Sequence, residues 1–309
     1  MNLCAVVVWY NPDATFVENI RSYASRVGRV YVIDNSAQNN AALLSDVENA
    51  VYVPNGENRG IAVALNQGCE RALADGFDWV MTMDQDSHWE CEILDKYLQL
   101  CEEYANERTV SFTSGRRNET KPNPAVLQRI WTVLRTNSTL RRILGKKSLA
   151  ELETSEKSMD VKFVDKVITS GNILSLSAWQ TVGKFLEPFF IDEVDYEFCF
   201  RLREHGYEIV KFPSIKMEHR LGQQPKKGYF FPPVTYHSGV RLFYIYRNCA
   251  YENKLHPEYF KKYGYRKGLR HRWLEVVLNL RFSQLKYLAR GGDCARHGRL
   301  GRYEDWYTD

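Results

Sequence analysis

Two aspartates one residue apart follow an apolar run in residues 79–87, WVMTMDQDS. A short apolar run is typical of a strand buried in a parallel sheet, and ligands of such sheets lie just beyond the carboxyl ends of the strands. Asp84 and Asp86 would there present carboxylates suited to Mg²⁺ or Mn²⁺, which prefer oxygen ligands. An isolated pair of this kind is more often an exposed acidic turn that caps the next helix, so the rest of the chain must decide.

Three further side chains could take part in the same chemistry. Asp34 ends a second apolar run, RVYVI, where its carboxylate could accept hydrogen bonds from a nucleotide base or ribose or could form an Asx turn. Asp195 shares one face of an expected helix with Phe198, Cys199 and Leu202. An acid there is costly unless it is paired or used, which makes Asp195 a candidate base. His219 closes a short expected strand; a lone histidine is more often structural, but its imidazole could complete the shell of an ion.

Small and polar residues mark other candidate positions. Thr169-Ser170-Gly171-Asn172 lies between two expected strands, where a backbone could approach a ligand closely. Asn58 can cap the helix expected at 61–74, and Asn66 lies inside that helix despite its poor helical propensity. Asp192 and Glu193 can cap the helix that carries Asp195, and Glu197 and Arg201 have the spacing of an ion pair on that helix.

The elements that position these residues alternate regularly in the first half of the chain. We expect strands at 3–9, 29–33 and 50–53 and from residue 78, with helices at 14–26 and 61–74 between them. A helix at 90–104 and strands at 109–113, 161–170, 207–212 and 215–222 follow. This alternation predicts an α/β fold with a doubly wound, mostly parallel sheet. Residues 115–159 are basic and polar, and we interpret them as an insertion that either contacts anionic lipid or substrate or, as we favour, forms a solvated helix.

Composition narrows the class of protein. The 309 residues include 13% aromatic residues, which excludes a disordered chain. Seven cysteines without C-x-x-C spacing argue against a disulfide framework or zinc site. The N-terminus begins as a strand without a basic segment, and no apolar stretch reaches the roughly 18 residues of a membrane span. We therefore expect no signal peptide and a cytoplasmic location.

The first turn, residues 9–13, excludes two common nucleotide-binding classes. It contains neither G-x-G-x-x-G nor G-x-x-x-x-G-K-[ST], which argues against a nicotinamide dehydrogenase and against a P-loop enzyme. It also lacks the glycine-rich phosphate loop of a sugar-nucleotide pyrophosphorylase. The net charge is only +4, and no recognised nucleic-acid-binding motif accompanies it, so we expect no nucleic-acid partner.

Taken together, the motifs resemble a family 2 glycosyltransferase with the GT-A fold, and most closely the bacterial rhamnosyltransferase branch. The resemblance runs from Val6 to about Asn248. Singly the motifs are weak, but their order and spacing are specific. They are V-V-x-W/Y-N-P, V-I-D-N-S, N-x-G-x-A-x-A-x-N-x-G, D-Q-D-S, T-S-G, F-I-D-x-V-D-x-E-x-x-x-R, H-x-L-G and a helix like R-x-Y-Y-x-x-R-N at 241–248.

The resemblance implies a role for each matching residue. Asp195 would be the catalytic base, with Asp192 as second choice. Asp86 and His219 would hold Mg²⁺ or Mn²⁺, with Asp84 nearer the ribose. The remaining donor-binding positions would be Tyr10, Asn11, Asp34, Asn58, Gly60, Asn66, Gly171, Arg201 and Arg247.

The resemblance also implies an activity and partners. We expect inverting, metal-dependent transfer of a sugar from a nucleotide-sugar donor, dTDP-rhamnose being favoured, to a glycan or lipid-linked glycan acceptor. The alternatives are a galactofuranosyl- or other hexosyltransferase using a UDP-sugar, and a non-catalytic sugar-nucleotide-binding module. The insertion at 115–159 departs from the family pattern and leaves the acceptor geometry open.

The C-terminal part is expected to be a separate unit. We predict a GT-A domain over 1–253 and a basic amphipathic helical tail over 254–309. The tail contains thirteen Lys and Arg residues but only six Asp and Glu residues. Apolar residues from Trp273 to Leu288 stand among these charges. Such a helix can lie on an anionic membrane surface, on the inner face of the plasma membrane, or can pack into a core or an oligomer.

Overall fold

The computed structural model describes residues 1–117, 161–219 and 237–308, with the side chains of 116, 117 and 219 excepted. Its N-terminal half is the expected parallel sheet. Four parallel strands lie in the order β3-β2-β1-β4, and they are β1 (Leu3–Trp9), β2 (Val30–Asp34), β3 (Ala50–Pro54) and β4 (Trp79–Asp84). The register sets Trp9 opposite Asp34 and Val8 opposite Asp84, so both acids lie at one edge of the sheet. The predicted fold class is confirmed.

Mixed strands extend the sheet beyond β4. β8 (Asn172–Ser175) is antiparallel to β4 and to β6 (Thr109–Arg117), and β9 (Glu208–His219) runs parallel to β6. Two short strands, β5 (Ser87–His88) and β7 (Lys162–Val164), pair antiparallel with β9. The strand predicted over 161–170 is wrong beyond residue 164, because the carbonyl and the N–H of Thr169 bond to the side chains of Thr82 and Asp195 instead of to the backbone of a neighbouring strand. The strands predicted at 207–212 and 215–222 form one strand as far as His219, with an irregular register around Pro213, and residues 220–222 lie outside the described residues.

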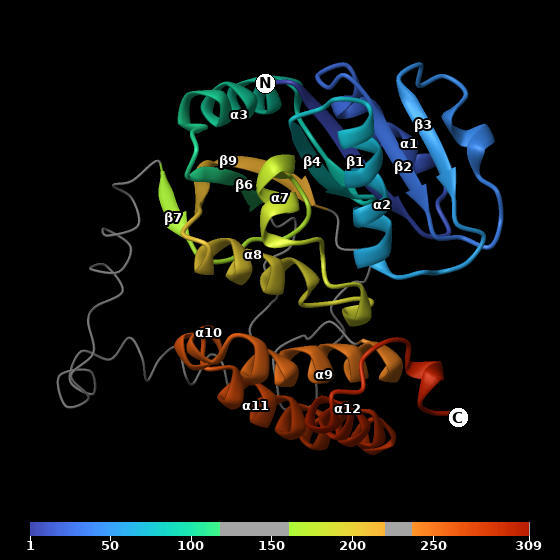
Figure 1. Ribbon diagram of the computed structural model, residues 1–309. Helices are drawn as coiled ribbons and strands as arrows, with labels where there is room; N and C mark the ends of the chain where they lie inside the picture. The colour runs from blue at the N-terminus through green and yellow to red at the C-terminus, as the bar shows by residue number, and fades with distance from the viewer. Residues whose placement is uncertain (118–160, 220–236, 309) are drawn as a thin grey trace, which may run out of the picture.

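Helices cover both faces of the sheet (Figure 1). Alternate residues of β1 point to opposite sides: Ala5 and Val7 pack with α1 (Ala14–Ala24) and α3 (Cys91–Tyr104), whereas Cys4 and Val6 pack with α2 (Ile61–Ala74). This second face also receives α7 (Leu176–Val182) and α8 (Val194–Glu204). The two faces therefore bury two separate cores, as expected for strands that are apolar throughout.

A layer of helices lies beside the carboxyl ends of the parallel strands (Figure 1). It consists of α9 (Gly239–Leu255), α10 (Pro257–Lys262), α11 (Tyr265–Leu278) and α12 (Leu285–His297). Two short 3-10 helices, η3 (Phe282–Gln284) and η4 (Tyr303–Asp305), lie in the same C-terminal part of the chain. Two others come earlier in the chain, η1 (Ala41–Leu44) and η2 (Glu187–Phe189). α9 begins at Gly239, inside the domain that was predicted to end at 253, and it packs closely along α12 of the predicted tail. The helical layer therefore begins before the predicted boundary. No helix in the described ranges is long and apolar enough to cross a membrane. Most of the predicted insertion, from residue 118, lies outside the described residues, whereas 115–117 belong to β6.

Candidate active site

Asp84 and Asp86 lie at the carboxyl end of β4, both partly buried. The backbone N–H of Asp84 donates to Ser170 Oγ at 3.3 Å, and Ser170 Oγ donates to Ser87 Oγ at 2.6 Å. Ser87 and Ser170 are themselves buried. Ser170 therefore contacts the backbone of Asp84 and the side chain of Ser87, the residue that follows the acidic pair.

The backbone of His219 comes to the same place. In the pairing of β5 with β9, Ser87 stands directly opposite His219, so the residue after Asp86 and the predicted histidine ligand are sheet partners. The side chain of His219 is not among those described. Among the described side chains, no three acids, histidines or cysteines are grouped for a metal, so the ion would need His219 or substrate oxygens besides the two aspartates. The two carboxylates are oxygen donors of the kind that Mg²⁺ and Mn²⁺ prefer, and the imidazole of His219 would be a further ligand.

The segment Thr169–Gly171 joins this acidic pair to Asp195. Thr82 Oγ1 of β4 donates to the carbonyl of Thr169 at 2.6 Å, and the N–H of Thr169 donates to Asp195 Oδ2 at 3.2 Å. Gly171 has φ of +72°, and a Cβ there would lie 2.9 Å from Met217 Sδ and 3.2 Å from the ring of Trp89. Packing within the protein thus requires a glycine at position 171. The groups that approach its backbone closely are the side chains of Met217 and Trp89, where a ligand was predicted.

Asp195 lies in the first turn of α8, partly buried, with Oδ1 accepting from the N–H of Tyr196 at 3.0 Å. Burial, followed by the negative charge of Asp84, raises the pKa of Asp195 to about 7, against the lowering effect of the N–H donors of Tyr196 and Thr169. Phe198, Cys199 and Leu202 on the same face are buried, as predicted. A carboxylate with this pKa can accept a proton near neutral pH.

Asp192, the second candidate base, is held in an ion pair. Arg241 donates to its two oxygens at 3.2 and 3.1 Å. The next residue, Glu193, has a pKa raised to about 7 by burial and then by the charge of Asp195. Of Glu193 and Asp195, only Asp195 has a pKa that is raised by the charge of Asp84.

Lys166 lies near Asp195 and was not among the site residues predicted from the sequence. The half-buried ammonium of Lys166 donates to the hydroxyl of Tyr265 at 3.1 Å, and that hydroxyl donates to Glu193 Oε2 at 3.3 Å. The ammonium also lies over the rings of Tyr196, Tyr263 and Tyr265 at 4.3, 4.2 and 4.8 Å. Lys166 and Tyr265 are 99 positions apart, so no local pattern indicates the contact.

Asp34 is fully buried, and both of its oxygens have protein partners. Oδ1 accepts from the N–H of Ser36 at 2.8 Å, and Oδ2 accepts from Asn40 Nδ2 and from the hydroxyl of Tyr52, each at 2.8 Å. The contact with Ser36 has the spacing of an Asx turn, which was the predicted alternative to nucleotide binding by Asp34. Asp34 thereby shapes the loop after β2, which is a structural role whether or not the donor also contacts it.

Tyr10 and Asn11 follow β1 at the same sheet edge. The N–H of Tyr10 donates to Gln85 Oε1 at 2.8 Å, and its ring is exposed. Asn11 has φ of +48°, and its N–H donates to Ser36 Oγ at 2.7 Å. The structure therefore brings Tyr10 and Asn11 between the loop of Asp34 and the acidic pair.

Asn58 and Gly60 precede α2. Asn58 Oδ1 accepts from the N–H of Gly60 at 3.0 Å, but Gly60 is itself the N-cap residue of α2, so Asn58 does not cap this helix as predicted. Gly60 has φ of +85°, and a Cβ there would lie 2.7 Å from the carbonyl oxygen of Phe190. The N–H of Ile61 also donates to this carbonyl at 2.7 Å. The start of α2 is therefore in direct contact with the segment that leads to Asp195.

Three predicted donor-binding side chains are fully used inside the protein. Asn66 exchanges hydrogen bonds with the backbone of Phe185 and donates to Glu187. Arg201 binds Glu197 through two N–H···O contacts, as its spacing predicted, and donates to the carbonyls of residues 182, 183 and 184. Arg247 is buried among carbonyl groups. We leave these three outside the proposed donor site.

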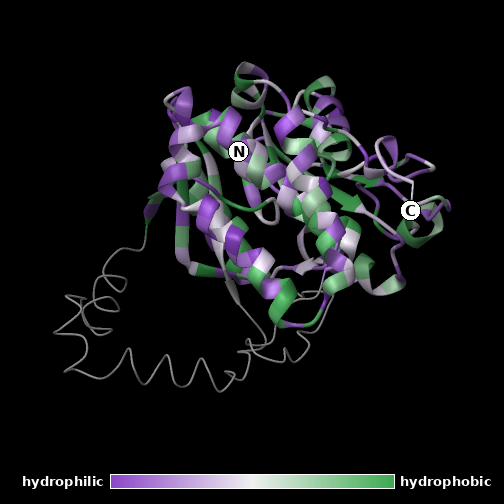
Figure 2. Ribbon diagram, turned by 90° about the horizontal axis from the view of Figure 1, so that it is seen from below, coloured by the Kyte–Doolittle hydropathy of each residue, from purple (hydrophilic) through white to green (hydrophobic). Residues whose placement is uncertain are grey.

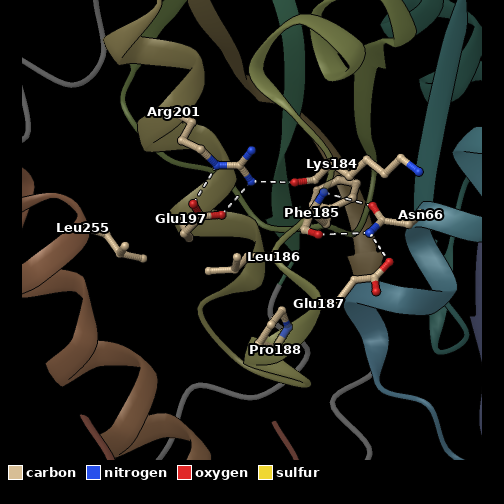
Figure 3. A pocket seen from close by; sticks show the side chains of 9 residues that line it. All are labelled: Asn66, Lys184, Phe185, Leu186, Glu187, Pro188, Glu197, Arg201 and Leu255. Atoms are coloured by element: carbon tan, nitrogen blue, oxygen red, sulfur yellow. Dashed lines mark hydrogen bonds and ion pairs between the residues drawn. The ribbon is translucent and has the colours of Figure 1, made fainter. Parts of the chain in front are cut away.

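Asn66 and Arg201 line a pocket of about 490 Å³ together with Lys184, Leu186, Pro188 and Leu255 (Figure 3). Glu197 and Arg201 project from the side of α8 that does not carry Asp195, and the pocket contains neither Asp84 nor Asp86. The pocket is therefore separate from the candidate active site.

Comparison with known proteins identifies the family. Glycosyl transferase family 2 matches residues 4–166. The chain is also 29% identical over 259 residues to the dTDP-rhamnosyl transferase RfbF of Shigella flexneri, covering 80% of this chain and 78% of that protein.

Two solved structures share the fold. S. aureus TarS has a TM-score of 0.50 at 13% identity over 82% of this chain, and GalNAc-T7 with UDP, GalNAc and Mn²⁺ has a TM-score of 0.52 at 13% identity over 84%. The match spans 39% and 49% of those longer chains. Both are GT-A glycosyltransferases, in agreement with the predicted fold. The family match covers more than half of the chain, which therefore belongs to glycosyl transferase family 2 and is a glycosyltransferase.

Proposed function

We propose that this protein transfers L-rhamnose from dTDP-rhamnose to a growing bacterial cell-surface glycan with inversion at the anomeric carbon. The observation that carries the mechanism is the pair of consecutive residues Thr169 and Ser170. Thr169 donates to the carboxylate of Asp195, and Ser170 accepts from the backbone N–H of Asp84. These two residues tie a candidate base to the acidic pair expected to face the donor diphosphate. The similarity to a dTDP-rhamnosyl transferase supports the choice of sugar.

In the proposed reaction, Asp195 accepts the proton of an acceptor hydroxyl. The hydroxyl oxygen attacks the anomeric carbon from the face opposite the nucleoside diphosphate, a new C–O bond forms, and the old C–O bond breaks with its electron pair leaving on the diphosphate. The proton remains on Asp195 until solvent removes it. A pKa of about 7 makes Asp195 a stronger base than an ordinary aspartate while leaving it substantially ionised at neutral pH.

Asp84 and Asp86, with His219 as a further ligand, would hold a divalent ion. Such an ion would neutralise the charge that develops on the leaving diphosphate. The chain's own contribution is to hold the backbone of Asp84 and the side chain of Ser87 through the hydroxyl of Ser170.

The helical layer supports a lipid-linked acceptor at a membrane surface. Large exposed apolar residues gather at the end of α11 and in the turn after it, and they are Leu274, Val277, Leu278, Leu280 and Phe282. Lys267, Arg270 and His271 are exposed one turn earlier at the spacing of the same helix face. Figure 2, seen from below, looks onto this layer, where hydrophobic and hydrophilic segments alternate. Basic residues beside an apolar patch suit an anionic lipid surface.

Donor choice is tested by calorimetry and by a transfer assay on the full chain. We expect dTDP-rhamnose to bind in the presence of Mn²⁺, EDTA to abolish transfer, and product to form on a bacterial glycan acceptor. Tighter binding of UDP-galactofuranose or a UDP-hexose would move the protein to another specificity of the family. Binding without any transfer to a panel of glycan acceptors would support a non-catalytic module.

Membrane association is tested by flotation with vesicles of anionic or zwitterionic lipid. We expect binding to the anionic vesicles alone, and loss of binding when Leu274 and Phe282 are both changed to Ser. Phe163→Ser is the matched control, because Phe163 is as exposed as Phe282 but lies on β7. Equal flotation of all three proteins would exclude this patch as the membrane contact.

A further inference from the structure

The segment that leads to Asp195 has an unfavourable backbone. Phe190, Asp192 and Glu193 have φ of 64°, 63° and 62°, in the left-handed region that non-glycine residues rarely adopt. Such conformations persist only where the surrounding structure holds them, and they gather at functional sites. Because Asp195 follows by two residues, the position of its carboxylate depends on what holds this segment.

Asn248 of α9 provides one set of contacts. Its fully buried side-chain amide donates to the carbonyl groups of Phe189, Ile191 and Asp192 at 3.0, 2.9 and 2.9 Å. One amide group thus binds carbonyls on both sides of Phe190. Its own oxygen accepts from Arg247 Nε at 2.8 Å, which fixes the orientation of the amide.

Arg247 holds the same segment one residue earlier, at Pro188, and connects it to a second segment at Gly301. Its Nη2 donates to the carbonyls of Pro188 and Phe189 at 3.1 and 3.0 Å, and its Nη1 donates to the carbonyl of Gly301 at 2.6 Å. The N–H of Gly301 in turn donates to the carbonyl of Pro188 at 2.8 Å. A guanidinium with planar, fixed donors is suited to hold several carbonyl groups in one arrangement.

Arg241 completes the set from the first turn of α9. Its guanidinium pairs with the carboxylate of Asp192 at 3.1 Å and is half exposed, so this contact is weaker than the buried ones. On its other side the segment meets α2, where Ile61 binds the carbonyl of Phe190.

We propose that Arg241, Arg247 and Asn248 are positioning residues that hold residues 188–193 so that the Asp195 carboxylate faces the acidic pair. This inference rests on the proposed role of Asp195 as base. It replaces the donor-binding role expected of Arg247, since all three nitrogens of its side chain donate to carbonyl or amide oxygens of the protein.

The decisive variant is Asn248→Asp, which keeps the size of the side chain but sets a carboxylate oxygen against three carbonyls. We expect kcat to fall by about 100-fold, as for a small misplacement of a reacting group. The affinity for the donor, measured by calorimetry, should be unchanged. Amide hydrogen exchange within residues 186–198 should become faster, which reports on the segment without reference to activity.

Asn279→Asp is the matched control. Asn279 is also a buried asparagine of the helical layer, but its amide donates to the carbonyl of Glu275 within α11. Normal kcat and exchange in folded Asn248→Asp would overturn the proposal. Equal losses in Asn279→Asp would overturn it too, because they would show a general effect of a buried charge.

If circular dichroism shows that Asn248→Asp does not fold, Arg241→Ala decides, because its side chain is half exposed and its removal leaves the core intact. Faster exchange in residues 186–198 with a partial loss of kcat supports the proposal, and no change in either overturns it. Failure of the base assignment would be seen separately, as activity in Asp195→Asn, and would leave the exchange result on the segment standing.

Discussion

The Asp195 carboxylate accepts a hydrogen bond from the backbone of Thr169, 26 positions earlier in the chain, at 3.2 Å. The next residue, Ser170, accepts from the backbone of Asp84. Two consecutive residues thus connect the proposed base to the acidic pair at the end of β4. A displacement of this segment would move the base and the acidic pair together, so their separation is maintained by the backbone.

Asp195→Asn should reduce transfer by at least about 100-fold while donor binding is retained, because the amide keeps the shape of the side chain but accepts no proton. Asp192→Asn is the matched comparison and should lose much less, since its partner Arg241 is at the surface. Initial rates and donor calorimetry on both proteins give the result. Near wild-type transfer in Asp195→Asn would reject this residue as the base.

Transfer should increase as the pH rises through about 7, the pKa of Asp195, because the base acts only when ionised. An ordinary aspartate would already be ionised above about pH 4. The measurement is the pH dependence of kcat/KM. Glu193 has a similar pKa of about 7, so Glu193→Gln serves as the control: the rise should remain in this variant. A flat profile down to about pH 5 would contradict the assignment.

Gly60→Ala should destabilise the fold by about 1–3 kcal/mol, through the left-handed backbone and the overlap of the new Cβ with the carbonyl of Phe190. Gly76→Ala separates the two causes, because Gly76 has φ of +82° but nothing within 4 Å of the added Cβ. Urea denaturation should show the larger loss for Gly60→Ala. Activity should fall as well in that variant, since Phe190 belongs to the segment before Asp195. Equal stability losses would mean that the contact with Phe190 is unimportant.

Glu252 makes the fold sensitive to high pH. It is fully buried on α9, and neither of its carboxylate oxygens accepts a hydrogen bond within the part of the chain that the structure describes. Burial, then the charges of Glu193 and Glu197, raise its pKa to about 9. The unfolded chain releases this proton near the ordinary value of 4.5, whereas the folded protein retains it, so stability falls as the pH rises from 4.5 to about 9.

Glu252→Gln should flatten this dependence, by at most about 1.4 kcal/mol per pH unit for a single group. Denaturation midpoints across the pH range provide the measurement. Glu258→Gln on the exposed side of α10 is the control and should leave the slope unchanged. The same slope in Glu252→Gln and in the wild type would show that Glu252 is not responsible.

The parallel half of the fold could be predicted because its signals are local. The strand predicted at 3–9 and the helix predicted at 61–74 coincide with β1 and α2. The strand predicted over 161–170 failed because Thr169 and Gly171 satisfy their backbone groups with Thr82 and Asp195, which are distant in the sequence. The two-residue strand β5 has no pattern of its own and exists only because β9 pairs with it.

The candidate site was predictable where residue type carries the chemistry. Asp84, Asp86 and Asp195 stand out as acids in apolar surroundings, and the structure brings Asp84 and Asp195 close enough for the charge of one to raise the pKa of the other. Asn66, Arg201 and Arg247 could not be assigned in this way, because an amide or a guanidinium binds a carbonyl group as readily as a phosphate. Only the positions of those carbonyls decide, and these depend on the folded chain.

The contact of Gly301 with Pro188 and Arg247 has a consequence for biosynthesis. A ribosome adds residue 301 long after the sheet and α8 have been made, and domains generally fold as units while synthesis proceeds. The nascent chain can therefore complete its two cores while residues 188–193 still lack one of their anchors. The contacts of Gly301 therefore form only after the segment around it has left the ribosome and docked against Pro188 and Arg247.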